Sequence, residues 1–318
     1  AVITPNGGIY GGPITSASAV LNGLIGRDNP TVTLIYTGTS NDGRTINSSN
    51  APEPAGTYTV TATIEDSNYT LNTESASAQF IVHRASPELT VSAIPNKDYG
   101  DAAFDLNISY EKDNVNSGEL SFLSSKTDVA TVDNNGKVTI TGAGTATLTV
   151  AVTQSANYEA ASCSVTITVD KADATEKLVI DTVLYEKTYG DSAFQIAASS
   201  EGNIAEIHYE SGDSTVVEAD TKGLVSIKNT GTAVITINMD ESRNYLAVSK
   251  NITVKVVPKE ITVTGINAES KVYDGNTNAT LNFDHVLYVG KLTDDVLTLS
   301  GTGTFADKNA GQDKTVQI

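Results

Sequence analysis

The residues best suited to chemistry in this sequence are two copies of a Tyr-Gly-Asp motif, in KDYGDAAF at 97–104 and KTYGDSAF at 187–194. A carboxylate beside a flexible glycine could act as a general base or as a metal ligand. Neither copy has a second ligand or an orienting group nearby in the sequence. The alternative is structural, with the tyrosine packing and Gly-Asp turning the chain at a strand edge. We favour this structural role for Tyr99, Gly100, Asp101, Tyr189, Gly190 and Asp191.

A second set of carboxylates could bind calcium, which prefers oxygen ligands. Asp128 and Asp133, beside Asn134 and Asn135, are weak calcium candidates. Their spacing does not fit the twelve-residue calcium loop, and Thr215 replaces Asp128 in the second copy of the block. Ordinary turn residues explain these positions better.

Histidine and cysteine offer no convergent site. His83, His208 and His285 fall in different parts of the chain, so a histidine-based site would need side chains from different domains. Cys163 has no partner in the chain, and it alternates with apolar residues on one strand face, so we expect a small core residue. The sequence has no G-x-S-x-G, P-loop or paired C-x-x-C pattern. We therefore expect no enzyme within this chain, and no cofactor.

The elements that position these residues are repeated strands. The block at 124–150 recurs 87 residues later at 211–237, and ANYEAASCSVTITV at 156–169 recurs at 243–256. The blocks alternate β-branched and polar residues, which is typical of half-buried antiparallel strands. No window shows sustained helical periodicity. We predict an all-β chain of tandem immunoglobulin-like β-sandwiches arranged end to end.

Asn-Tyr is a further repeated pair, at positions 68, 157 and 244. A tyrosine that recurs at the same domain position indicates a packed strand corner, as in immunoglobulin folds. A stacking platform for sugars is the alternative for these and the other tyrosines. We favour the corner.

Short charged or proline-containing stretches separate the repeats and predict four modules. They comprise residues 1–84, 85–170, 171–257 and 258–318. We call them segments 1 to 4. Because the links are only a few residues long, neighbouring modules should be held end to end.

The formal net charge of −18 excludes most nucleic-acid binding, which requires clustered Lys and Arg. The four segments carry −3, −7, −5 and −3, so the acidic residues form a solvated surface and not one site. No stretch is long and apolar enough for membrane insertion. The chain begins at Ala1 without a signal peptide, so we expect a piece of a longer polypeptide, and a monomer.

TDVATVDNNGKVTITGAGTATLTV at 127–150 and its copy at 214–237 resemble the bacterial immunoglobulin-like repeats of cell-surface proteins. Residues 36–82, with YTG early and AGTYTVTAT late, resemble an MBG-type module. Tyr273, Asp274 and Gly275, with GTGTFADKNAG downstream, resemble a YDG-type module. The sequence ends before the YDG pattern does, so we expect segment 4 to be truncated. Residues 1–35 match no module.

The resemblance implies a non-catalytic, extracellular region of a bacterial surface or secreted protein. Its expected role is a stalk that projects an adhesive or catalytic domain. The alternatives are an adhesin module that binds host glycan or an extracellular matrix protein, and accessory modules of a secreted polysaccharide-degrading enzyme. By analogy with surface immunoglobulin-like folds, Lys–Asn crosslinks within a module are a further possibility.

Overall fold

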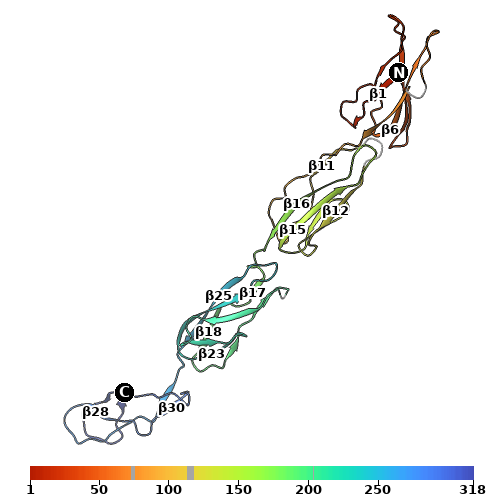
Figure 1. The fold of residues 1–318 in the computed structure, drawn as a ribbon. Coiled ribbons are helices and arrows are strands. Elements are labelled where there is room, and N and C mark those ends of the chain that lie inside the picture. Colours follow the sequence, from red (N-terminus) through yellow and green to blue (C-terminus); the bar gives the residue numbers. More distant parts are fainter. Residues whose placement is uncertain (73–75, 113–117, 203) are drawn as a thin grey trace. The chain divides into compact units, whose positions relative to one another are not determined.

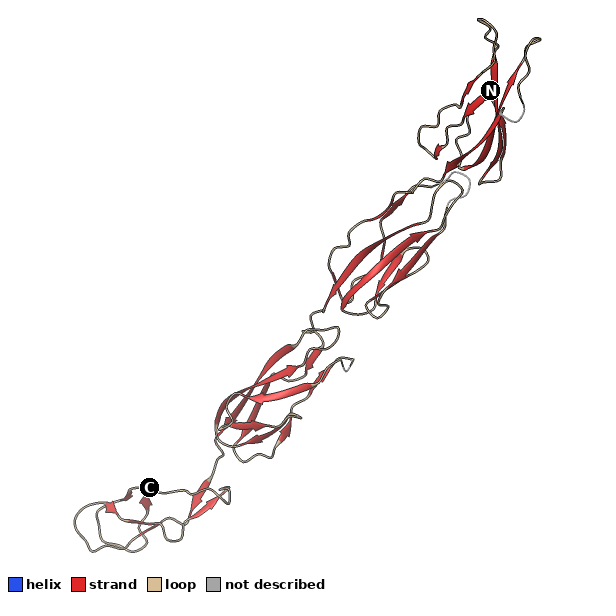
Figure 2. Ribbon diagram, viewed as in Figure 1, coloured by secondary structure: helices blue, strands red, loops and turns tan. Residues whose placement is uncertain are grey.

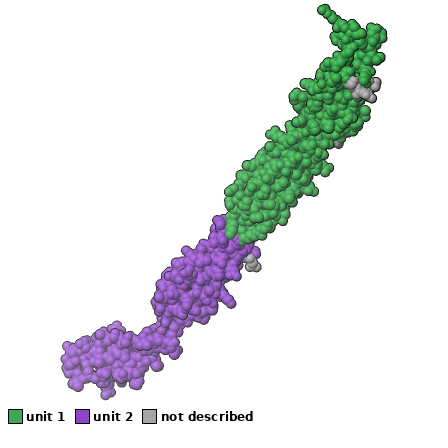
Figure 3. All heavy atoms as spheres, in the orientation of Figure 1, with its two compact units in different colours: residues 1–172, 243–245 green, residues 173–242, 246–318 purple. Residues whose placement is uncertain are grey.

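The computed structural model describes residues 1–72, 76–112, 118–202 and 204–318, and all regular elements among them are β-strands (Figure 2). The all-β prediction is therefore confirmed. The described chain forms two compact units (Figure 3). Unit 1 comprises Ala1–Ala172 and Arg243–Tyr245, and unit 2 comprises Asp173–Ser242 and Leu246–Ile318.

Segment 1 is built on a five-stranded sheet with a small two-stranded sheet beside it. The order in the large sheet is β2 (Gly8–Ile9), β7 (Ser77–His83), β6 (Gly56–Ile64), β4 (Val32–Ser40) and β5 (Thr45–Ser48). The small sheet pairs β1 (Val2–Thr4) with β3 (Ser18–Val20). Its core includes Tyr36, Tyr58 and Phe80, and the Phe80 ring lies against the rings of both tyrosines.

Segment 2 has two facing sheets and a separate strand pair (Figure 1). The four-stranded sheet runs β12 (Leu120–Ser124), β15 (Gly144–Val152), β16 (Ala161–Asp170) and β9 (Lys97–Asp98). The three-stranded sheet runs β10 (Phe104–Asp105), β14 (Lys137–Ile140) and β13 (Ala130–Val132). The pair joins β11 (Ile108–Tyr110) to β8 (Leu89–Val91).

One core cluster of segment 2 takes residues from both sheets, which makes the segment a sandwich. Val138 comes from the three-stranded sheet, while Leu148 and Ile167 come from the four-stranded one, and all three are 0% exposed. This follows from the alternation in the sequence, because every second side chain on a strand points to the same face. Cys163 is half-buried on this face, and burial raises the pKa of its thiol.

Segment 3 repeats the arrangement of segment 2. Its four-stranded sheet runs β18 (Leu184–Thr188), β25 (Val248–Val257), β24 (Gly231–Met239) and β21 (Ile207–Ser211). Its three-stranded sheet runs β19 (Phe194–Gln195), β23 (Leu224–Ile227) and β22 (Val217–Ala219), and its pair joins β17 (Leu178–Ile180) to β20 (Ala198–Ser200).

Segment 4 has short strands and little apolar burial. One strand pair joins β26 (Thr262–Thr264) to β30 (Leu287–Val289), and another joins β27 (Asn267–Ala268) to β29 (Leu281–Asn282). A three-stranded sheet runs β28 (Asn278–Ala279), β31 (Gly303–Phe305) and β32 (Val316–Gln317). All residues at 258–318 are described, and no hydrophobic side chain among them is buried. Val272 and Val296 are 90% and 94% exposed.

Candidate functional site: the joints between repeats

The Tyr-Gly-Asp motif ends a short strand that runs parallel to the closing strand of its segment. The tyrosine amide donates a hydrogen bond to the carbonyl at the end of that closing strand. The pairs, each 2.9 Å from N to O, are Tyr99 to Asp170 and Tyr189 to Val257. Segment 1 has the same arrangement, with the Tyr10 amide 2.9 Å from the carbonyl of His83.

The next residue in each copy is a glycine in the left-handed region, which glycine occupies at little steric cost. The φ values are +73° at Gly11, +99° at Gly100 and +89° at Gly190. The aspartate then caps the turn. Asp101 Oδ2 accepts from the Asp98 amide at 3.2 Å, and Asp191 Oδ2 accepts from the Thr188 amide at 2.8 Å.

The first and last residues of each eight-residue motif, a lysine and a phenylalanine, contact each other across this turn. The Lys97 ammonium lies 5.1 Å from the ring centroid of Phe104, and that of Lys187 lies 4.7 Å from that of Phe194. A cation over an aromatic face contributes about 0.5–1 kcal/mol at an exposed site. Both copies therefore form the same self-contained turn, which presents its tyrosine at the end of the segment.

The first joint holds segment 1 against segment 2 through Asn157. The Asn157 side chain is 7% exposed, and its Oδ1 accepts a hydrogen bond from the Ala55 amide at 2.9 Å. Ala55 precedes β6 in segment 1 and is 0% exposed. The Asn157 side chain therefore supplies the acceptor for a buried amide of segment 1, which would otherwise be left unpaired.

Tyr158 completes the first joint. Its ring meets the Tyr10 ring edge to face, with centroids 5.5 Å apart and planes at 87°. The link between the segments is bonded to the same loop, because Ala85 forms a parallel bridge with Tyr158. The Ala85 amide donates to the Asn157 carbonyl at 2.9 Å, and the Ala85 carbonyl accepts from the Glu159 amide at 2.8 Å.

A second joint of the same design lies within unit 1 and uses Asn244 and Tyr245. Asn244 Oδ1 accepts from the Ala143 amide at 2.9 Å, and the Tyr99 and Tyr245 ring centroids are 5.5 Å apart with planes at 80°. Ala172 bridges to Tyr245, and its amide donates to the Asn244 carbonyl at 2.9 Å. The side-chain bond, ring pair and link bridge of the first joint therefore all recur.

Each joint adds polar contacts of its own. In the first, Asn41 Nδ2 donates to the Ala156 carbonyl at 3.1 Å, and Arg84 Nε donates to the Ser155 carbonyl at 2.9 Å. In the second, the Arg243 guanidinium pairs with the Asp128 carboxylate. The hydrogen bond and charge of Arg243 lower the pKa of Asp128 below its ordinary value of 3.8.

The third Tyr-Gly turn, within unit 2, has a different occupant. The Tyr189 hydroxyl donates to Asp295 Oδ1 at 2.9 Å, and this bond to a carboxylate raises the pKa of the tyrosine. The Leu292 side chain lies against Gly190, where an added Cβ would come within 2.7 Å of it. Leu292 and Asp295 belong to the KLTDD stretch of segment 4.

Family models match three parts of the chain. They describe an MBG domain at residues 10–86, an intimin immunoglobulin-like domain at 113–154 and a YDG domain at 257–318. Together the three matches support bacterial immunoglobulin-like repeats with MBG and YDG modules. Segment 1 contains most of the MBG match and segment 4 nearly all of the YDG match, so the resemblance drawn from the sequence is confirmed.

A curated relative is an uncharacterized protein of Clostridium acetobutylicum, 30% identical over 135 residues. The match covers 42% of these repeats but only 14% of that protein. Among solved structures, the Drosophila N-cadherin fragment EC1-4 is 13% identical, with 81% of this chain and 72% of that one covered and a TM-score of 0.27. Domains 1–6 of the surface layer protein SbsC are 15% identical, with 100% and 52% covered and a TM-score of 0.26. Both TM-scores are below 0.5.

The remaining predicted residues of the immunoglobulin-like repeats lie in turns. Asp133 Oδ1 accepts from the amides of Asn135 and Lys137, which closes the hairpin between β13 and β14. Neither Asp128 nor Asp133 joins a metal-ligating group within the described residues. In the YDG segment, Tyr273 is 63% exposed, Gly275 has a φ of +76°, and Asp274 accepts from Lys271 and Asn276.

Sequence reasoning missed two features of the repeats. Residues 1–35 were expected to match no module, but the MBG match begins at residue 10, and Tyr10-Gly11 is a Tyr-Gly turn without the aspartate. The Asn-Tyr tyrosines were expected at a corner within one sandwich, whereas Tyr158 contacts the preceding segment. The available signal was that the Tyr-Gly pairs at 10, 99 and 189 and the Asn-Tyr pairs at 68, 157 and 244 recur at similar spacings. Tyr69 differs, since its hydroxyl bonds to Asp28 within its own segment.

None of the described residues belongs to an apolar helix of membrane-spanning length.

Proposed function

We propose that these repeats form an extended, non-catalytic stalk outside the bacterial cell, in which the joints fix each repeat to the next and so project a further domain. The observation that carries the proposal is that two joints use the same contacts at the same distances. The Asn–Ala bonds are both 2.9 Å, and the tyrosine pairs are both 5.5 Å between centroids.

These contacts are strong enough to limit bending. Leaving a buried amide unpaired costs about 1–3 kcal/mol, and an edge-to-face ring pair contributes about 0.5–1.5 kcal/mol. Bending at the first joint would break both, and would also strain the backbone bonds of Ala85. Since about 2.8 kcal/mol reduces a bent state to roughly 1%, the joint favours a single orientation.

The family matches and the charge support a surface location. MBG, YDG and intimin-type immunoglobulin-like domains are surface repeat modules. A net charge of −18 spread over all segments keeps neighbouring copies apart in a crowded surface layer.

Small-angle X-ray scattering of the full chain tests the proposal. A compact globule of this length would have a radius of gyration near ~20 Å. Four sandwiches in line, each about 35 Å long, would give about 40 Å. We expect about 40 Å, and a value near 20 Å would overturn the stalk.

The joint mechanism needs its own variant. Asn157→Ala combined with Asn244→Ala should shorten the largest dimension and broaden the distance distribution, because the side-chain hydrogen bond of each joint is lost. Asn229→Ala is the matched control, since the Asn229 side chain donates to the Thr215 carbonyl within segment 3. A double variant that scatters like the control would show that the joints do not set the shape.

A further inference from the structure

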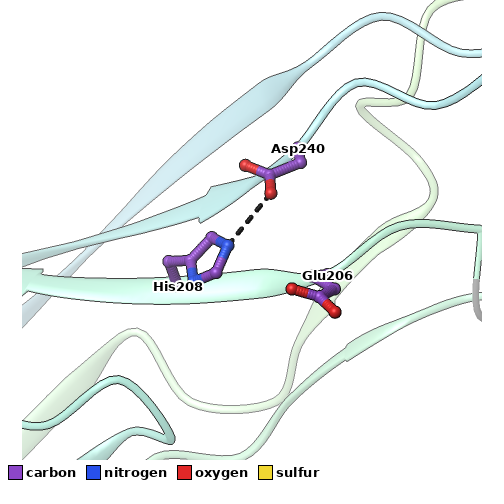
Figure 4. A group of neighbouring side chains, drawn as sticks. All are labelled: Glu206, His208 and Asp240. Carbon is purple, nitrogen blue, oxygen red and sulfur yellow. Dashed lines mark hydrogen bonds and ion pairs between the residues drawn. The ribbon is translucent and has the colours of Figure 1, made fainter.

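Three potential metal ligands converge on the solvent face of segment 3 (Figure 4). One donor atom each from Glu206, His208 and Asp240 lies within 4.8 Å of the others. His208 Nε2 is 3.0 Å from Asp240 Oδ2. All three side chains are exposed, so an ion can reach them from solvent.

The register of the sheet produces this convergence. His208 lies opposite Asn238 in the antiparallel pairing of β21 with β24, and the Asp240 amide donates to the Glu206 carbonyl at 3.1 Å. Glu206 and Asp240 are therefore opposite one another, and His208 is two residues from Glu206. Because side chains two apart share a face, all three point to the same side of the sheet.

The donor set suits a zinc-class ion. One imidazole nitrogen and two carboxylate oxygens are ligands that Zn²⁺ accepts at about 2.0–2.2 Å, and three protein ligands leave a position for water. Two donors bound to one ion at about 2.1 Å can be at most roughly 4.2 Å apart. Small rotations of exposed side chains bring the present group into that range.

The surrounding charge favours a cation. Glu206 forms no ion pair with any lysine or arginine among the residues that the structure describes. Glu210 lies two residues beyond His208 on the same strand face and is also exposed. Glu206 and Glu210 therefore place two carboxylates on the strand face that carries His208.

The preceding repeat shows that the fold itself does not require this group. The residues at the matching positions in segment 2, 87 earlier, are Glu119, Ser121 and Thr153. The backbone there is the same, with the Thr153 amide 3.0 Å from the Glu119 carbonyl. Of these two repeats, segment 3 is therefore the one that combines the imidazole with the second carboxylate.

We propose that Glu206, His208 and Asp240 bind a zinc-class divalent ion, which staples the edge strand β21 to its neighbour β24. This proposal is independent of the stalk. The test is a titration of the full chain with Zn²⁺ alone, followed by calorimetry and by thermal unfolding. We expect one ion per chain, and a rise in the unfolding temperature of segment 3.

His208→Asn should weaken Zn²⁺ binding at least tenfold, and Asp240→Asn should weaken it severalfold. His285→Asn is the control, since His285 lies in segment 4 and should leave binding unchanged. Equal Zn²⁺ binding by His208→Asn and the wild type, or no binding at millimolar Zn²⁺, would overturn the proposal and leave an ordinary ion pair.

The preceding repeat offers a gain-of-function test that does not depend on any loss. Ser121→His with Thr153→Asp should complete a second group beside Glu119 and raise the stoichiometry from one ion to two. Both positions are exposed, so the changes should not disturb the core. A stoichiometry that stays at one would show that this arrangement of ligands is not sufficient to bind the ion.

Discussion

Replacement of Asn157 by alanine tests the central contact of the first joint. The side chain accepts the amide of Ala55, which is 0% exposed, so water cannot readily take its place. An unpaired buried amide costs about 1–3 kcal/mol. Because 1.4 kcal/mol is a factor of ten, hydrogen exchange at the Ala55 amide should accelerate about five- to 150-fold.

The second joint provides an internal comparison. Asn244 and Ala143 are only half-buried, so solvent can partly replace the lost bond in Asn244→Ala. We expect about 0.5–1.5 kcal/mol there, or roughly two- to 13-fold faster exchange at Ala143. Asn229→Ala should change neither amide. Unchanged exchange at Ala55 in Asn157→Ala, or a larger effect at the second joint than at the first, would refute the reasoning.

Three further predictions concern residues of segment 2, namely Asp128 with its ion-pair partner Arg243, Gly100 and Leu148. The hydrogen bond and charge of Arg243 lower the pKa of Asp128, so its ion pair should stabilise the second joint above pH 3.8 and lose that effect as the pH falls through the lowered value. The melting-temperature difference between wild type and Asp128→Asn should therefore be positive at neutral pH and shrink as the pH falls below 3.8. Gly100→Ala meets no atom within 4 Å but must adopt a φ of +99°, so denaturant unfolding should show a loss of about 1–2 kcal/mol; no loss would mean that the turn relaxes. Leu148→Ala, at a 0% exposed core position, should cost about 2–5 kcal/mol in the same assay, against less than about 0.5 for the exposed Thr147→Ala, and equal losses would contradict the core assignment.

Local patterns were sufficient for the strands and turns. Val138 and Leu148 are buried where alternation placed them, because a strand's side chains point to opposite faces regardless of the partner. Gly136 has a φ of +82° in the turn between β13 and β14, where Asn135-Gly136 is a pair typical of tight hairpins. The Tyr-Gly-Asp turn is equally local, since its aspartate caps an amide three residues earlier.

The group of potential metal ligands depends partly on local sequence and partly on tertiary structure. Glu206, His208 and Glu210 in EIHYE alternate along a strand, so the sequence places them on one face. Asp240 is 32 residues beyond His208, and only the register of β21 against β24 brings it to that face. A register shift of one residue would send it to the opposite side.

The sequence by itself determined an all-β chain of repeated sandwiches, because the period-two alternation and the glycine turns depend on neighbouring residues alone. It also marked Tyr-Gly and Asn-Tyr as recurring pairs. Only the tertiary structure decided that the two pairs meet, since the bond from Ala55 to Asn157 joins residues 102 positions apart. Which surfaces come together depends on how whole segments pack, and no local pattern encodes that.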